Sequence, residues 1–146
     1  MEKRLQMARR RLGRQGGTAV VEFALVLPML LLILLGIIDF SLALYDKSVI
    51  THAAREGARA GIVLRNPKLT TNEIRQVVLS HTNNALLNLG GSEVPVVTVV
   101  QSNPASFPNP LSVSVSYTFR GIGIGSLFAS LGSPIVLNAA MVMVNE

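Results

Sequence analysis

The sequence contains no cysteine, only two histidines and few charged residues, which make up 14% of the chain. Without cysteine it has no disulfide framework, no thiolate metal site, no cysteine nucleophile and no lipidated cysteine anchor. His52 and His81 leave little material for a metal site, and we expect both to be partly buried helix residues. No Ser–His–acid spacing and no carboxylate pair points to catalysis. We therefore expect neither an enzyme nor a cofactor or metal.

The positive charge is confined to the start of the chain. The net charge is +5. Residues 1–17 hold six basic residues against one acid, whereas residues 18–146 hold seven of each sign. A nucleic-acid-binding protein needs basic residues on its folded body, where they can neutralise phosphates. The distribution therefore argues against nucleic acid as a partner.

A long apolar segment follows the basic leader, from Thr18 to Tyr45, with Glu22 and Asp39 as its charged residues. As a helix it would be about 42 Å long, which exceeds the roughly 30 Å of a bilayer's hydrocarbon core. The segment predicts a transmembrane helix. The arginine-rich end should stay in the cytoplasm, with the rest of the chain outside. Asp39 would then lie near the outer interface, as an interfacial acid or in a salt bridge with another subunit.

The helix is expected to continue past the membrane to Leu64, since Asn66-Pro67 is the first strong stop. Such a helix, about 70 Å long, cannot pack entirely on the rest of the chain, so half of it must meet lipid or neighbouring subunits. Small residues recur along its second half, with Ala53, Gly57 and Gly61 at four-residue spacing and Ala54 and Ala58 beside them. This stripe allows another element to approach closely, in the chain's own core or in a second subunit.

The remaining residues predict a small α+β unit. Thr70-x-x-Glu73 forms a capping-box pattern, which predicts a helix from there to about Leu89, stopped by Gly90-Gly91. Strands are predicted over residues 94–101, 111–119 and 135–144. The middle one alternates without error between apolar residues and serine or threonine, as a strand with one buried face does. The glycine-rich stretch at residues 121–125 fits no phosphate-binding motif and is interpreted as a flexible connection.

The predicted fold class is therefore α+β, with a long N-terminal transmembrane helix followed by a small domain of one helix and about three antiparallel strands. Three parts are expected: a basic leader (residues 1–17), a long transmembrane helix (18–65), and an extracytoplasmic α+β domain (66–146).

The junction between leader and helix carries the most informative chemistry. Gly17 ends the leader, and Glu22 would be the fifth residue of a chain that began at Thr18. A carboxylate in a membrane helix costs roughly 2.5–3.5 kcal/mol, so such a group tends to have a partner. Cleavage after Gly17 would supply one, because the new amino group of Thr18 lies one helical turn from Glu22. Between packed helices, Glu22 of one subunit could meet the Thr18 amine of the next.

Three segments in this order resemble the TadE-like pseudopilins of Tad (tight adherence, Flp-type) pilus systems. Gly17 followed by Val-Glu-Phe at 21–23 is similar to a prepilin-peptidase site. Ala-Leu-Val-Leu-Pro, ending at Pro28, is similar to the start of the family's hydrophobic helix. Ala-Ala-Arg-Glu-Gly-Ala-Arg at 53–59, which includes Arg55, Glu56, Gly57 and Arg59, is similar to the motif after the membrane. The resemblance covers about residues 16–61.

The resemblance implies an inner-membrane minor pseudopilin, cleaved after Gly17 by a prepilin peptidase and assembled by helix packing, with Glu22 in an assembly role. It implies the peptidase, other pilins of the Tad system, the inner-membrane assembly platform and the lipid bilayer as partners. It also implies that Pro28 and the 55–59 motif contribute helix contacts. No cofactor is implied.

Two other interpretations stay open. The chain could be an uncleaved, signal-anchored periplasmic or extracellular binding domain. Alternatively, an ordinary signal peptidase could cut after Ser41-Leu42-Ala43, a weak A-x-A-like site.

Overall fold

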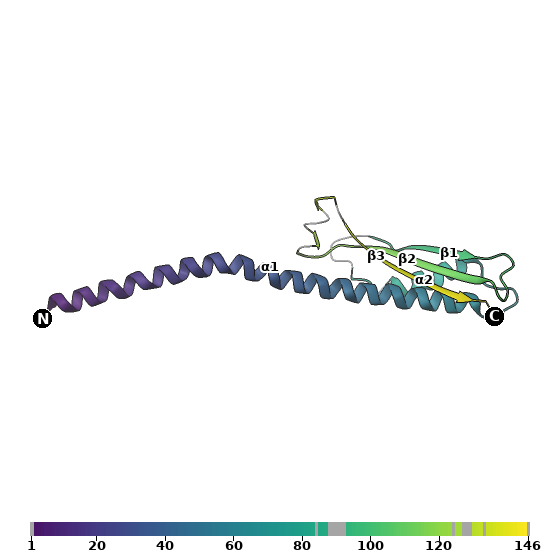
Figure 1. The fold of residues 1–146 in the computed structure, drawn as a ribbon, viewed down its shortest axis with the longest axis horizontal. Helices are drawn as coiled ribbons and strands as arrows, with labels where there is room; N and C mark the ends of the chain where they lie inside the picture. The colour runs from purple at the N-terminus through teal and green to yellow at the C-terminus, as the bar shows by residue number, and fades with distance from the viewer. Residues whose placement is uncertain are drawn as a thin grey trace.

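The computed structural model describes residues 2–83, 85–87, 93–123, 125–126, 130–132 and 134–145, with residues 2–16 described by their backbone alone. Its main element is α1 (Glu2–Ile62), one continuous helix of 61 residues, or roughly 90 Å. The helix ends at Ile62, two residues before the predicted end, and it extends backward through the basic leader. In Figure 1 the remaining elements pack along its C-terminal half, and the N-terminal half projects alone.

The second helix, α2 (Thr71–Thr82), begins as predicted. The Thr70 hydroxyl accepts a hydrogen bond from the Glu73 N–H, and the Glu73 carboxylate accepts one from the Thr70 N–H. The predicted end at Leu89 is wrong, because the helix ends at Thr82. The chain leaves the helical path there, and the Leu87 N–H donates to the Asp46 carboxylate of α1 at 3.0 Å. Gly90 and Gly91 lie outside the described residues.

Three strands form an antiparallel sheet in the order β1-β2-β3. They are β1 (Val96–Gln101), β2 (Pro110–Phe119) and β3 (Ile135–Val144). The predicted third strand is confirmed with its bounds. β1 begins two residues later than predicted, after Pro95, and β2 one residue earlier. Two helices packed on a three-stranded antiparallel sheet confirm the predicted α+β class.

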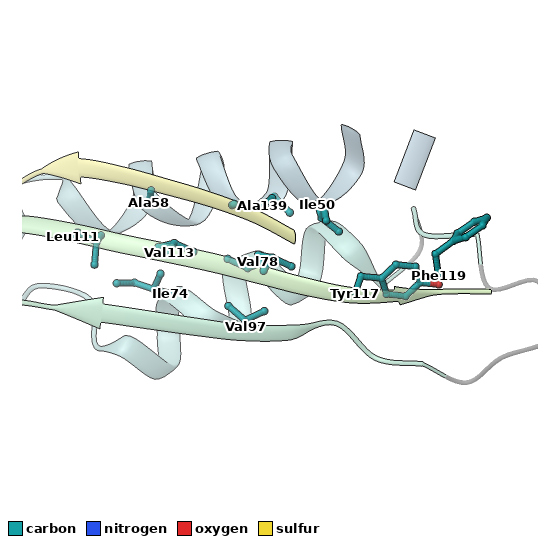
Figure 2. Close-up of a cluster of buried hydrophobic side chains, with 13 residues drawn as sticks. Ile50, Ala58, Ile74, Val78, Val97, Leu111, Val113, Tyr117, Phe119 and Ala139 are labelled. Atoms are coloured by element: carbon teal, nitrogen blue, oxygen red, sulfur yellow. The ribbon is translucent and has the colours of Figure 1, made fainter. Parts of the chain in front are cut away.

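The core lies between the sheet and the two helices (Figure 2). The alternation predicted for β2 is confirmed, because its apolar residues are buried and its serines are half-buried on the other face. The helices bury Ile50, Ala53, Ala54 and Ala58 from α1 and Ile74 and Val78 from α2. The C-terminal half of α1 is thus part of the domain's core and fixes the direction in which the N-terminal half projects.

Candidate functional site

The projecting half of α1 has the length of a membrane span. From Gly17 to Ile38 every residue except Gly36 is exposed, and Asp39 is the first buried residue from Gly17 onward. This stretch is about 33 Å long, close to the roughly 30 Å of a hydrocarbon core. The helix that carries it is long and apolar enough to cross a membrane. The structure is therefore compatible with a single-pass anchor whose domain begins where the apolar segment ends.

The sequence-predicted processing residues lie at the start of this exposed segment. Gly17 and Thr18 are exposed and helical, and a Cβ added at Gly17 would meet nothing within 4 Å. Glu22 is also exposed. Thr18 and Glu22 are four residues apart on one helix, so their side chains share a face, one turn apart. A peptidase could approach this stretch without contacting the folded domain.

Pro28 lies within the helix rather than at an end of it. It has no N–H to donate to the carbonyl of residue 24, and its ring crowds the preceding turn. The helix continues through this position and is bent along its exposed half (Figure 1). Lipid-facing helices tolerate such a proline where the helix can adjust locally. The sequence left a kink and simple accommodation open, and the structure shows a continuous helix.

The motif after the membrane divides into two faces of α1. A Cβ added at Gly57 would lie 2.3 Å from Val78 Cγ2, and one added at Gly61 would lie 2.4 Å from Leu111 Cδ2. The small-residue stripe thus lets α2 and β2 approach α1 closely, and of the two predicted roles the structure shows the intramolecular one. The charged members of the motif are exposed on the other side of the helix: Arg55, Glu56 and Arg59.

A carboxylate clamp, formed by Asp39 and the backbone of Ile122, Gly123 and Gly125, joins α1 to the connection between β2 and β3. Asp39 is only 6% exposed. Its Oδ1 accepts hydrogen bonds from the N–H of Ile122 at 2.9 Å and Gly123 at 3.3 Å. Its Oδ2 accepts from Gly123 at 3.1 Å and Gly125 at 2.8 Å. Bonds to an ionised acceptor are stronger than neutral ones, and together they offset the cost of burying the charge.

Close approach requires glycine at position 123 of the clamp and at position 121 just before it. A Cβ at Gly121 would lie 2.6 Å from Asp39 Cγ, and one at Gly123 would lie 2.8 Å from Leu35 Cβ. The sequence-based interpretation of this stretch as a flexible connection was therefore wrong. For Asp39 the sequence left an interfacial acid and a salt bridge with another subunit open, and the structure shows neither, since the carboxylate is buried and accepts from backbone N–H groups of its own chain. A lone acid in an apolar helix was a usable signal, because such a group needs polar partners.

A second buried acid, Asp46, lies two turns beyond Asp39 on α1. Its Oδ1 accepts from the Leu87 N–H, and its Oδ2 is buried with no hydrogen-bond partner among the residues that the structure describes. Burial raises the pKa of the nearby Tyr117 phenol, and the negative charges of Asp46 and Glu93 raise it further. Tyr117 therefore stays neutral in the core over the physiological range.

The two histidines differ from expectation. His81 and His52 are both exposed, not partly buried. His81 lies outside the buried face of α2, which consists of Ile74, Val78 and Thr82 at four-residue spacing, and its Nδ1 lies 2.8 Å from the Val77 carbonyl oxygen. Within the described ranges, no three histidine or acidic side chains gather in a way that could hold a metal ion.

An apolar groove runs beside the clamp. It has a volume of about 470 Å³ and lies between α1 and the start of β3. Its lining includes Gly36, Phe40 and Leu44 from the helix and Ile135 and Val136 from the strand. The groove therefore begins at the end of the bilayer-length segment.

Comparison with known proteins supports the resemblance seen in the sequence. Residues 17–59 match a family described as TadE-like protein, which confirms that resemblance over these residues. The match begins at Gly17, the first residue of the exposed segment, and ends at Arg59, the last residue of the motif after the membrane. No curated protein and no solved structure matches the chain.

Proposed function

Taking residues 17–59 as a TadE-like segment, we propose that the chain is a minor pseudopilin of a Tad (Flp-type, type IVc) pilus or a related secretion machine. In this proposal a prepilin peptidase cleaves it after Gly17 on the cytoplasmic face of the inner membrane. The mature chain then keeps its helix in the bilayer and its α+β domain outside. The observation that carries the proposal is the exposed, bilayer-length segment of α1, which begins at Gly17 and has an acid, Glu22, five residues beyond that glycine.

The geometry supports cleavage at this position. Gly17 and Thr18 are exposed and far along the helix from the domain, whose first buried residue is Asp39. Removal of the leader would leave the core described by the structure intact, because every residue in that core lies beyond the leader. It would also remove the +5 excess of residues 1–17 and leave a mature chain with equal numbers of acidic and basic residues.

Glu22 is the assembly residue in this proposal. An unpartnered carboxylate in the hydrocarbon core costs roughly 2.5–3.5 kcal/mol. After cleavage, the Thr18 amine offers a positive partner one turn away in the same helix or on the helix of a neighbour. A pairing between neighbours would fix the register of helices that otherwise meet through apolar contacts. Arg55, Glu56 and Arg59 face away from the domain core and are available to other pilins or to the assembly platform.

Cleavage after Ala43 by an ordinary signal peptidase fits the structure poorly. This cut would remove residues 1–43, including Asp39. The clamp that Asp39 forms with Ile122, Gly123 and Gly125 would then lose its carboxylate. Ala43 is also packed in the middle of a helix against the core, not in an extended segment.

Processing in cells tests the proposal. The full chain is expressed with and without a Tad prepilin peptidase, and its size is followed on gels. We expect a peptidase-dependent shortening that Gly17→Leu abolishes. Gly16→Leu is the matched control and should still be processed. Failure of the peptidase to shorten the wild-type chain would contradict the proposal and favour an uncleaved, membrane-anchored binding domain.

A further inference from the structure

The clamp fixes part of the domain at the level where the exposed helix segment ends. The Ile122 N–H bonds Asp39, and Gly123 lies against Leu35, the last full turn of the exposed segment. If the bilayer covers the exposed residues up to Ile38, the connection after β2 lies at the outer membrane surface. This step rests on the membrane insertion that belongs to the proposed function.

Apolar side chains are exposed at this same level. We define the collar as Phe40, Ile122, Ile135 and Val136, which are 66%, 59%, 39% and 48% exposed. Phe40, Ile135 and Val136 line one groove together with Gly36, and Ile122 is fixed by the clamp to Asp39. The collar therefore lies on and beside the helix where it would leave the hydrocarbon. Exposed apolar groups gathered at one place mark an interaction surface.

We propose that the collar is a second membrane contact, and that it rests in the boundary between headgroups and acyl chains of the outer leaflet. The occupant is a phospholipid surface because the collar is continuous with the apolar, exposed half of α1 and lies at its bilayer-length end. The contact holds the domain at a fixed height and orientation, with the β1–β2 connection pointing away from the membrane. Leu111, at that far end, contacts Gly61, which lies about 33 Å beyond Asp39 along the helix.

The sequence has no tryptophan, so single tryptophans can report depth in the full-length protein. The variants Ile122→Trp and Val136→Trp probe the collar, and Leu30→Trp probes the membrane segment. Phe107→Trp, at an exposed position in the β1–β2 connection, is the matched control. Each protein is reconstituted in phosphatidylcholine vesicles with or without bromine on the acyl chains. Only variants whose thermal unfolding midpoint, measured by circular dichroism, equals that of the wild type are used. If one collar variant does not meet this condition, the other still probes the collar.

We expect bromolipid to quench the emission at Leu30→Trp and at the collar variants, and to leave Phe107→Trp unchanged. Quenching at Leu30→Trp without quenching at either collar position would overturn the proposed contact and leave the proposed function intact. No quenching at Leu30→Trp would instead overturn the membrane insertion on which both depend. A blue-shifted collar emission that depends on protein concentration and not on bromine would assign the collar to a second copy of the chain, and would also overturn the proposal.

Discussion

Removing the Asp39 carboxylate should release the connection after β2 from α1. The carboxylate accepts from three backbone N–H groups at 2.8 to 3.3 Å, and hydrogen bonds to a charged group contribute about 1.5–3 kcal/mol each. Water recovers part of this when the loop opens, so we expect Asp39→Ala to lower the free energy of unfolding by about 3 kcal/mol. For a domain of about 100 residues, this corresponds to a fall in Tm of at least ~10 °C.

Two assays follow this change in detergent micelles: thermal unfolding by circular dichroism and limited trypsinolysis. Arg120 is the last basic residue in the sequence, so cleavage after it releases residues 121–146 as a single fragment. Asp39→Ala should accelerate release of this fragment at temperatures well below the Tm. Asp39→Asn keeps one acceptor oxygen and should give an intermediate effect.

Ser41→Ala is the matched control, because Ser41 is exposed on the same helix and its hydroxyl donates to the Ile37 carbonyl one turn back. It should behave as the wild type in both assays. Equal Tm values and equal trypsin rates for Asp39→Ala and Ser41→Ala would refute the reasoning that the clamp fastens the loop.

Three further outcomes are expected. Gly57→Ala should lower the free energy of unfolding by about 1–3 kcal/mol in thermal unfolding, because its Cβ would lie 2.3 Å from Val78 Cγ2. Gly17→Ala should leave the thermal unfolding unchanged, and similar melting of the two variants would contradict the close approach at Gly57. The N–H and hydroxyl of Thr70 lower the pKa of the Glu73 carboxyl below its ordinary value of 4.5. The stability that the capping box contributes is therefore fully present above pH 4.5, and it is lost as the pH falls through the lowered pKa of the folded state. Glu73→Gln should therefore reduce the loss of unfolding free energy at acidic pH. An unchanged loss would contradict a stabilising role for the capping box. Glu22→Ala should leave leader cleavage intact and abolish cross-linking to neighbouring pilins, whereas normal cross-linking would remove Glu22 from assembly.

Local patterns predicted most of the fold. The alternation in β2 fixed which residues face the core, because side chains in a strand point to opposite faces in turn. The capping box placed the start of α2 correctly, since both of its hydrogen bonds join residues three positions apart. The end of α2 could not be read in this way. The chain after Thr82 is held by a bond between the Leu87 N–H and Asp46, two residues far apart in the sequence.

The clamp escaped prediction for the same reason. Asp39 and the glycines at 121–125 are separated by more than half the chain, and neither pattern specifies the other. Each place in the sequence indicated one side of the contact. Asp39 is an acid that needs hydrogen-bond donors, and the glycine-rich stretch has a backbone that can approach another element closely. By contrast, the stripe containing Gly57 and Gly61 was recognised as a close-approach surface, because one helix carries the whole pattern.

The most direct test of the account is the first residue of the protein recovered from membranes of cells that contain a Tad prepilin peptidase. Intact mass and N-terminal sequencing give it without any substitution. The account predicts a chain of residues 18–146 that begins at Thr18. A chain that still begins at Met1, or one that begins at Leu44, would contradict it.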